Sequence, residues 1–167
     1  MTISTVHATQ VMTICSMVLY LKFFIALAIQ ANKSVKADAR PPEDKSTKSN
    51  EPKPTLEMGD EPSNEAEYAS TPADMTVANA AYVRWQRIVA NDLENIPLAL
   101  ILAWGALIAS GNNTVNVVAI IVFTTARVMH TMAYAFALQP YRSICWLIGV
   151  LAILVLAGNA IYGSFKQ

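Results

Sequence analysis

The uneven distribution of charged residues is the feature that most constrains how this chain can fold. Residues 32–95 hold 20 of its 24 Asp, Glu, Lys and Arg residues. The other 103 residues hold four charges, all basic: Lys22, Arg127, Arg142 and Lys166. Soluble domains carry about 25% charged residues, whereas this chain is 14% charged and 54% hydrophobic. The pattern excludes a soluble globule, a disordered chain and a disulfide scaffold, and indicates a small polytopic membrane protein.

Four stretches are apolar enough, or nearly so, to cross a bilayer. A spanning helix needs about 20 mostly apolar residues. These stretches do not alternate between apolar and polar residues, so helices fit them better than barrel strands. We therefore expect an all-α, polytopic membrane four-helix bundle that forms a single domain over residues 1–167. The spans are expected at about residues 11–31, 77–109, 115–136 and 142–164.

The segment from about residue 38 to 75 is expected to be a flexible cytosolic loop. It contains six of the eight prolines, among Lys, Glu, Ser and Asn, and such a composition cannot bury a core. Lys and Arg residues concentrate around it, which places it on the cytosolic side of the membrane. Alternation then places the turn at 139–142 in the cytosol, and the N-terminus and the turn at 110–114 on the lumenal side. Residues 1–10 lack Lys and Arg, so we expect an uncleaved first span rather than a signal peptide.

Polar residues inside the expected spans are the candidates for a functional site, because ionisable groups in a membrane usually face the bundle interior. Helical spacing puts the members of two groups on one face each, and a third group begins the fourth span. All three groups fall at the cytosolic edge or in the cytosolic half of their spans. They are Arg87, Asn91 and Glu94; Arg127, His130, Thr131 and Tyr134; and Arg142 and Ser143.

Each of these residues also has a purely structural interpretation. Arg84 and Arg87 could anchor the helix at the membrane interface. Arg127 could form a structural ion pair with Glu94, and His130 could simply form a hydrogen bond between helices. The convergence of three helices nevertheless favours a ligand site. Arg side chains grip carboxylates and Glu94 could accept an ammonium group, which fits a small zwitterionic molecule with excess carboxylates. The lipid would supply an apolar second substrate.

Three sequence blocks in the right order resemble the MAPEG family, the membrane-associated proteins in eicosanoid and glutathione metabolism. They are Arg87-Ile-Val-Ala-Asn91-Asp-Leu-Glu94 followed by Pro97, Arg127-Val-Met-His130-Thr-Met-Ala-Tyr134, and Gln139-Pro-Tyr-Arg142-Ser143. The resemblance is strong over residues 84–165. It is closest to the branch that contains microsomal glutathione transferase and microsomal prostaglandin E synthase.

The resemblance implies a homotrimer in the endoplasmic reticulum membrane or the mitochondrial outer membrane, with glutathione as co-substrate between protomers. The expected glutathione-binding residues are Arg87, Asn91, Glu94, Arg127, His130, Tyr134 and Arg142, with Lys33 or Ser34 at the family's basic contact. Arg142 and Ser143 would be catalytic, because positive charge near a thiol favours the nucleophilic thiolate. The implied partners are hydrophobic electrophiles, lipid hydroperoxides and membrane lipid. The implied activity is a detoxifying glutathione transferase with a peroxidase side activity.

Two alternative functions stay open. One is a glutathione-dependent prostaglandin E synthase, and the other is a non-catalytic lipid-binding scaffold of the same fold. By this resemblance the synthase branch has a basic residue at the position of Ala90, and its absence here favours the transferase. Ser143 weakly favours the synthase. The retained Arg, Asn, Glu and Tyr residues speak against the scaffold. We expect no metal site, and no nucleic-acid partner, because the sequence offers no basic face.

Overall fold

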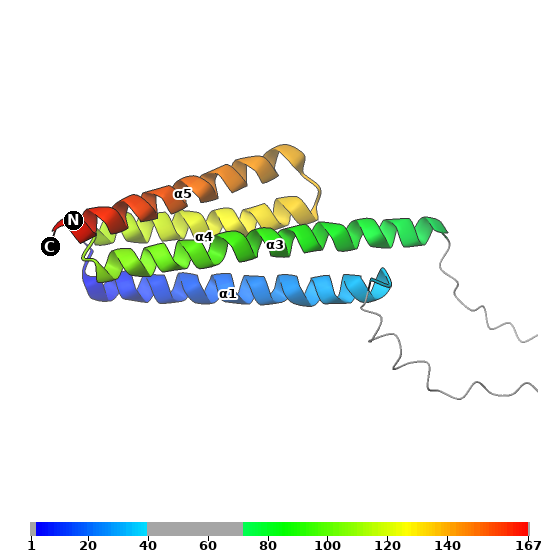
Figure 1. Cartoon of the computed structure of the whole chain (residues 1–167), viewed down its shortest axis with the longest axis horizontal. Helices are drawn as coiled ribbons and strands as arrows, with labels where there is room; N and C mark the ends of the chain where they lie inside the picture. Colours follow the sequence, from blue (N-terminus) through cyan, green and yellow to red (C-terminus); the bar gives the residue numbers. More distant parts are fainter. Residues whose placement is uncertain (1–2, 40–71, 167) are drawn as a thin grey trace, which may run out of the picture.

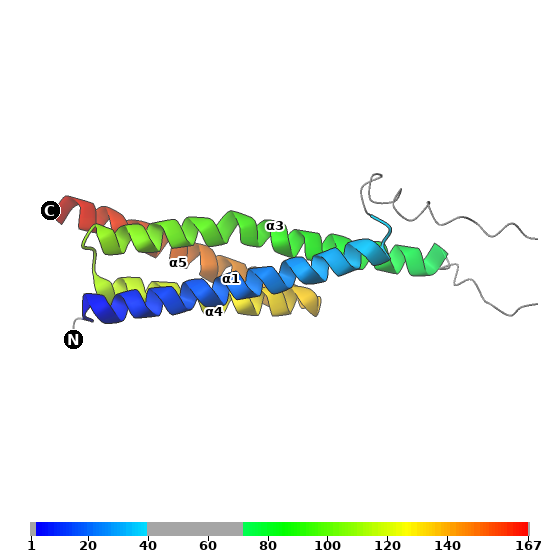
Figure 2. The same cartoon turned by 90° about the horizontal axis from the view of Figure 1, so that it is seen from below.

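A computed structural model of the chain describes residues 3–39 and 72–166. Within these ranges the chain is helical and has no strand. The four helices run side by side in an elongated bundle, and the start of the first and the end of the last lie at the same end (Figures 1 and 2). The helices are α1 (Thr5–Lys36), α3 (Pro72–Ile108), α4 (Asn113–Ala135) and α5 (Gln139–Lys166).

The described helices agree with the predicted fold class. By length and composition, α1, α4 and α5 can each cross a membrane. Helix α3 is apolar only from Ile96 onward, because Arg84, Arg87, Asp92 and Glu94 precede that point. The prediction of an all-α membrane four-helix bundle is therefore confirmed, and the chain is a multi-pass membrane protein.

Helix α3 begins within the segment that we expected to be a loop. The expected loop extended to about residue 75, but the helix starts at Pro72. Proline fits the first turn of a helix, where its missing N–H leaves no hydrogen bond unmade. Residues 40–71, which make up most of the expected loop, lie outside the described residues.

The core of the bundle combines bulky aliphatic side chains with alanines. Ala99 and Ala103 of α3 are fully buried, as are Ile120 and Phe123 of α4 and Leu156 of α5. Small residues let helix backbones approach closely, which is the usual way that helices pack inside a membrane. Large apolar side chains remain exposed on the outer faces of the helices, where the lipid lies.

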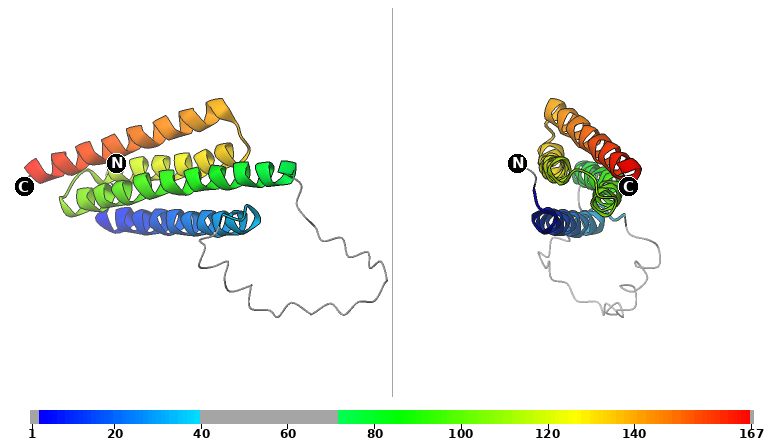
Figure 3. Two further views of the ribbon diagram at one scale, coloured as in Figure 1. Left: turned by 45° about the vertical axis from the view of Figure 1, so that its right-hand side comes forward. Right: turned by 90° about the vertical axis from the view of Figure 1, so that its left-hand side faces the viewer.

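Helices α1 and α5 lie on opposite sides of the α3–α4 pair, as the end-on view of Figure 3 shows. In the described part of the chain α5 packs on α3 and α4, and α1 does the same, but α1 and α5 do not contact each other. Any link between α1 and α5 therefore runs through side chains of the two middle helices.

The end of the bundle that contains the α3–α4 turn is fixed by close backbone contacts. Asn159 of α5 accepts a hydrogen bond from the backbone N–H of Asn112 at 2.9 Å and donates one to its carbonyl at 3.1 Å. Gly163 lies so near the same turn that a Cβ atom there would come within 2.6 Å of the carbonyl oxygen of Ala109. These contacts hold the last turns of α5 against the α3–α4 turn.

Candidate functional site

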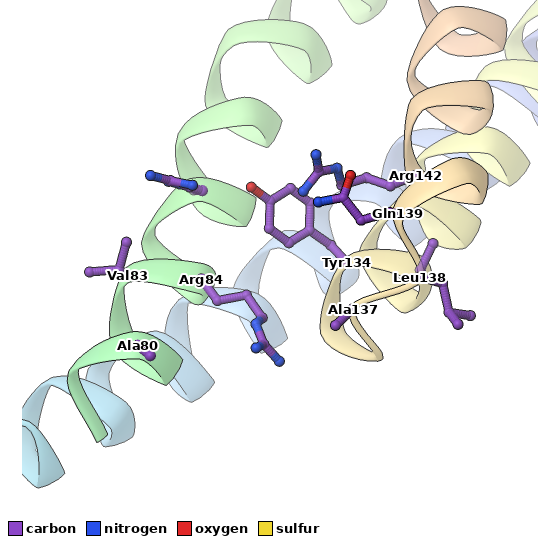
Figure 4. Close-up of a pocket in the computed structure, with 10 residues that line it drawn as sticks. Ala80, Val83, Arg84, Tyr134, Ala137, Leu138, Gln139 and Arg142 are labelled. Atoms are coloured by element: carbon purple, nitrogen blue, oxygen red, sulfur yellow. The ribbon is translucent and has the colours of Figure 1, made fainter. Parts of the chain in front are cut away.

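A cavity of about 230 Å³ lies at the end of the bundle remote from the start of α1 and the end of α5 (Figures 1 and 4). We call it the arginine cavity, because three guanidinium groups contribute to its lining. Helix α3 forms one wall, and the end of α4, the α4–α5 turn and the start of α5 form the other. Its lining residues are Ala80, Val83, Arg84, Arg87, Ala133, Tyr134, Ala137, Leu138, Gln139 and Arg142.

Tyr134 is the central aromatic residue of the arginine cavity. Its ring extends from α4 toward α3, and the side chains of Arg142 and Gln139 lie beside it (Figure 4). The guanidinium carbon of Arg142 is 4.6 Å from the ring centroid. The imidazole of His130 packs against the same ring, with centroids 5.6 Å apart and an angle of 60° between the planes. Tyr134 is therefore held between a buried His and a cavity-lining Arg.

The turn between α4 and α5 brings Tyr134 and Arg142 together. Ala137 adopts a left-handed conformation with φ of 59°. The N–H of Leu138 donates to the carbonyl of Ala133 at 2.8 Å, and that of Ala137 donates to the carbonyl of Tyr134 at 3.1 Å. This is the hydrogen-bond pattern of a Schellman helix end, which reverses the chain within a few residues. The wall that α4, the turn and α5 form is therefore fixed by backbone geometry.

Arg84 connects α3 to the same turn. Its Nη1 atom donates a hydrogen bond to the carbonyl of Ala135 at 3.4 Å. A cation near the carbonyls of a helix C-terminus is electrostatically favourable. Arg84 is half-buried rather than free in solvent, so it is more than a simple interfacial anchor.

The lining of the arginine cavity is strongly electropositive. It contains three Arg residues and no Asp or Glu. Guanidinium groups form their strongest contacts with carboxylates and phosphates, often through two parallel hydrogen bonds. The cavity therefore suits an anionic ligand with more than one acidic group.

The structure brings some of the predicted site residues together and separates others. Arg87, Tyr134 and Arg142 line the arginine cavity, and Arg84 and Gln139 join them. The other predicted residues lie outside that lining. Asn91 is half-buried with an unpaired Oδ1, Glu94 and Ser143 are exposed, and Arg127 and His130 are buried within the bundle. Thr131, Lys33 and Ser34 are half-buried and also lie outside it. Gln139 opens the third motif block but was not predicted to be a site residue, because only the tight turn places it beside Tyr134.

The comparison with protein families extends over nearly the whole chain. The MAPEG family matches residues 12–162, a range that includes the main part of every described helix. This chain belongs to the MAPEG family. No curated protein matches it significantly. The resemblance drawn from the three motif blocks is thus confirmed at the level of the family.

Membership of the MAPEG family limits the ligands to be considered for the arginine cavity. The family includes glutathione transferases and prostaglandin E synthases, and also non-catalytic members. Glutathione carries two carboxylates and one ammonium group at neutral pH, so a cavity lined by three guanidinium groups fits its excess of negative charge. In the residues that the structure describes, no group of three His, Cys, Asp or Glu side chains could hold a metal ion.

The structural pairing of Arg127 in this MAPEG protein differs from the one we considered. Arg127 does not pair with Glu94; its Nη2 atom bonds Oδ1 of Asp92, and Nζ of Lys22 bonds Oδ2 of the same carboxylate. We call Lys22, Asp92 and Arg127 the buried charge cluster. Asp92 is 0% exposed and Arg127 is 1% exposed.

Asp92 pairs with Arg127, and Glu94 does not, because the two carboxylates lie on different faces of α3. Ile88, Asp92, Ile96, Ala99 and Ala103 are all buried and follow the helical spacing i, i+4, i+8, i+11, i+15. Asp92 is therefore part of the inward stripe, whereas Glu94 is rotated away and exposed. The apolar neighbours of Asp92 were the signal that could have identified it.

Proposed function

We propose that this MAPEG protein is a membrane-bound glutathione transferase that conjugates glutathione to hydrophobic electrophiles and also reduces lipid hydroperoxides. The observation that carries the proposal is the convergence of Arg84, Arg87 and Arg142 beside Tyr134 in one cavity. The carboxylates of glutathione would bind these guanidinium groups. The family membership supports glutathione as the ligand.

Arg142 is the residue best placed to activate the thiol in this proposal. A free thiol has a pKa of about 8.5, and a nearby cation favours the thiolate, which is the nucleophile. The thiolate would displace a leaving group from a halogenated compound or add to an unsaturated one. With a hydroperoxide it would attack the terminal oxygen, so that the O–O bond breaks, the alcohol leaves and the sulfur becomes a sulfenic acid. A second glutathione would then form the disulfide and release water. Ser143, next in sequence, would assist at the sulfur.

A second protomer would complete the site. The arginine cavity of about 230 Å³ is smaller than the roughly 300–1,000 Å³ of most ligand pockets. Glu94 and Ser143 lie outside it and are exposed on the single chain. A homotrimer would cover these faces and let Glu94 bind the ammonium group of glutathione. Hydrophobic electrophiles would reach this site from the lipid of the endoplasmic reticulum membrane or of the mitochondrial outer membrane.

Glutathione-dependent prostaglandin E synthesis is a second candidate function. One residue favours it and another speaks against it. Ser143 follows Arg142 directly, which favours the isomerase. Ala90 places a methyl group at the position where, by the resemblance, the synthase branch has a basic residue. This difference favours the transferase. We therefore rank the transferase first.

The deciding experiment compares glutathione-dependent conjugation of 1-chloro-2,4-dinitrobenzene by the purified wild-type protein and by Arg142→Ala. The transferase should lose most of its turnover in this variant. Lys166→Ala is the matched control, because Lys166 is exposed and is the last residue of α5, whereas Arg142 lies in its first turn. Turnover that survives Arg142→Ala would remove Arg142 from the mechanism, and absence of glutathione binding by the wild type would favour the non-catalytic scaffold.

A further inference from the structure

The buried charge cluster contains more positive charge than its own bonding requires. Lys22 on α1 and Arg127 on α4 share the single carboxylate of Asp92 on α3. One Lys or one Arg would already neutralise that carboxylate. Ionised groups within a membrane protein are costly and usually have a function. The second cation therefore needs an explanation beyond linking two helices.

No other described group absorbs the excess charge. The groups that face Lys22 are Asp92 from α3, and Arg127 and His130 from α4, while α5 contributes the cation Arg142 beyond them. The Nε atom of Arg127 and the Nδ1 atom of His130 are buried and have no hydrogen-bond partner. The buried charge cluster thus carries a formal charge of +1 while its three side chains remain in their ionised forms.

The buried charge cluster is separated from the arginine cavity by about two turns of α4. Arg127 precedes Tyr134 by seven residues, which is about 10 Å at a rise of about 1.5 Å per residue. His130 lies between them and packs against Tyr134, whose face holds Arg142. The intervening material is packed protein, which screens a charge much less than water does.

We propose that the uncompensated positive charge of Lys22, Asp92 and Arg127 promotes ionisation of the glutathione thiol bound in the arginine cavity. The inference rests on the proposed function. Lys22 touches neither glutathione nor the electrophile, so it is not a catalytic residue; it acts through the field of the cluster. The thiol proton passes to water, and the thiolate keeps the electron pair that attacks the electrophile.

The sign of the cluster charge provides a test that a purely structural role would fail. Lys22→Met reduces the formal charge of the cluster from +1 to 0, whereas Asp92→Asn raises it to +2. At an effective dielectric constant of about 20 and a separation of about 15 Å, one charge changes the acidity constant of the thiol about sixfold. The bound thiol should therefore become a weaker acid in Lys22→Met and a stronger acid in Asp92→Asn.

The measurement is the ultraviolet absorbance of the thiolate of glutathione bound to the full-length purified protein, followed against pH. Lys22→Arg keeps the charge and should restore the wild-type titration. Lys166→Met removes an exposed lysine at the far end of α5 and controls for the change of net charge. The pH profile of kcat/KM for conjugation should shift in the same direction as the absorbance.

Two results would overturn the inference while the proposed function stands. One is a wild-type titration in Lys22→Met, and the other is a shift of the same sign in Lys22→Met and Asp92→Asn. If Asp92→Asn fails to fold, the comparison of Lys22→Met with Lys22→Arg decides alone. If the wild type binds no glutathione, the proposed function is wrong and the inference falls with it.

Discussion

The guanidinium group of Arg142 lies over the ring of Tyr134, 4.6 Å from its centroid. A guanidinium ion over an aromatic face is attracted by the negative charge of the ring face, and this contact favours Arg over Lys. The contact also joins α4 to α5 across a turn of only a few residues. Tyr134 therefore limits the positions that Arg142 can take before any ligand arrives.

We predict that Tyr134→Leu lowers kcat/KM for glutathione conjugation about fivefold more than Tyr134→Phe does. Both variants remove the hydroxyl group, but only Leu removes the aromatic face, and a cation–π contact contributes about 1 kcal/mol. Steady-state kinetics with glutathione as the varied substrate measure the difference. Equal kcat/KM values in the two variants would mean that the ring does not hold Arg142.

Glu94→Gln should weaken glutathione binding about tenfold, because it replaces a charged partner of the ammonium group with a neutral one. Glu94 is exposed on the single chain, so the substitution should leave the fold of the protomer unchanged. Calorimetric titration of wild type and variant with glutathione measures the affinity. Identical affinities would break the assignment of Glu94 to the ligand.

Asp92→Ala should destabilise the protein by about 3–5 kcal/mol, because it leaves Lys22 and Arg127 buried without their counter-ion. The combined variant Lys22→Met, Asp92→Leu, Arg127→Met removes all three charges and should fold with nearly wild-type stability. Thermal unfolding in detergent compares the two. A combined variant that is no more stable than Asp92→Ala would show that unpaired charge is not the cause.

Gly163→Ala should destabilise the protein by about 1–3 kcal/mol, because the added Cβ would meet backbone atoms of Ala109 and Gly111 that cannot move aside cheaply. Gly158→Ala is the matched control on the same helix, since nothing lies within 4 Å of a Cβ at that position. It should stabilise the helix by up to about 1 kcal/mol, as Ala is the better helix former. Thermal unfolding of both variants should therefore move in opposite directions, and a joint shift would contradict the close packing of Gly163.

The helices and part of the site could be predicted because they depend on local patterns. The apolar stretches determine the four helices, and the motif around Arg142 identified a residue that lines the arginine cavity. The position of Gln139 could not be predicted, because it depends on the left-handed turn at Ala137. A left-handed alanine carries no sequence signal, since glycine is the usual residue in that conformation.

The partner of Arg127 was harder to predict for a different reason. Asp92 and Glu94 are two residues apart on α3, and both are acidic. Their roles differ by a rotation of the helix, which depends on how α3 packs against α1 and α4. The buried apolar neighbours of Asp92 along the helix identify it as the inward carboxylate, whereas the acidic side chain alone does not distinguish it from Glu94.

The start of α1 and the end of α5 lie together at the end of the bundle that is remote from the start of α5, which carries Arg142 (Figure 1). Helix α5 has 28 residues, and at about 1.5 Å per residue it is roughly 40 Å long. An affinity tag or a fluorescent fusion attached next to the start of α1 or the end of α5 therefore sits a bilayer's thickness away from the arginine cavity. Such labels can report purification, assembly and membrane orientation without obstructing the mouth of the arginine cavity.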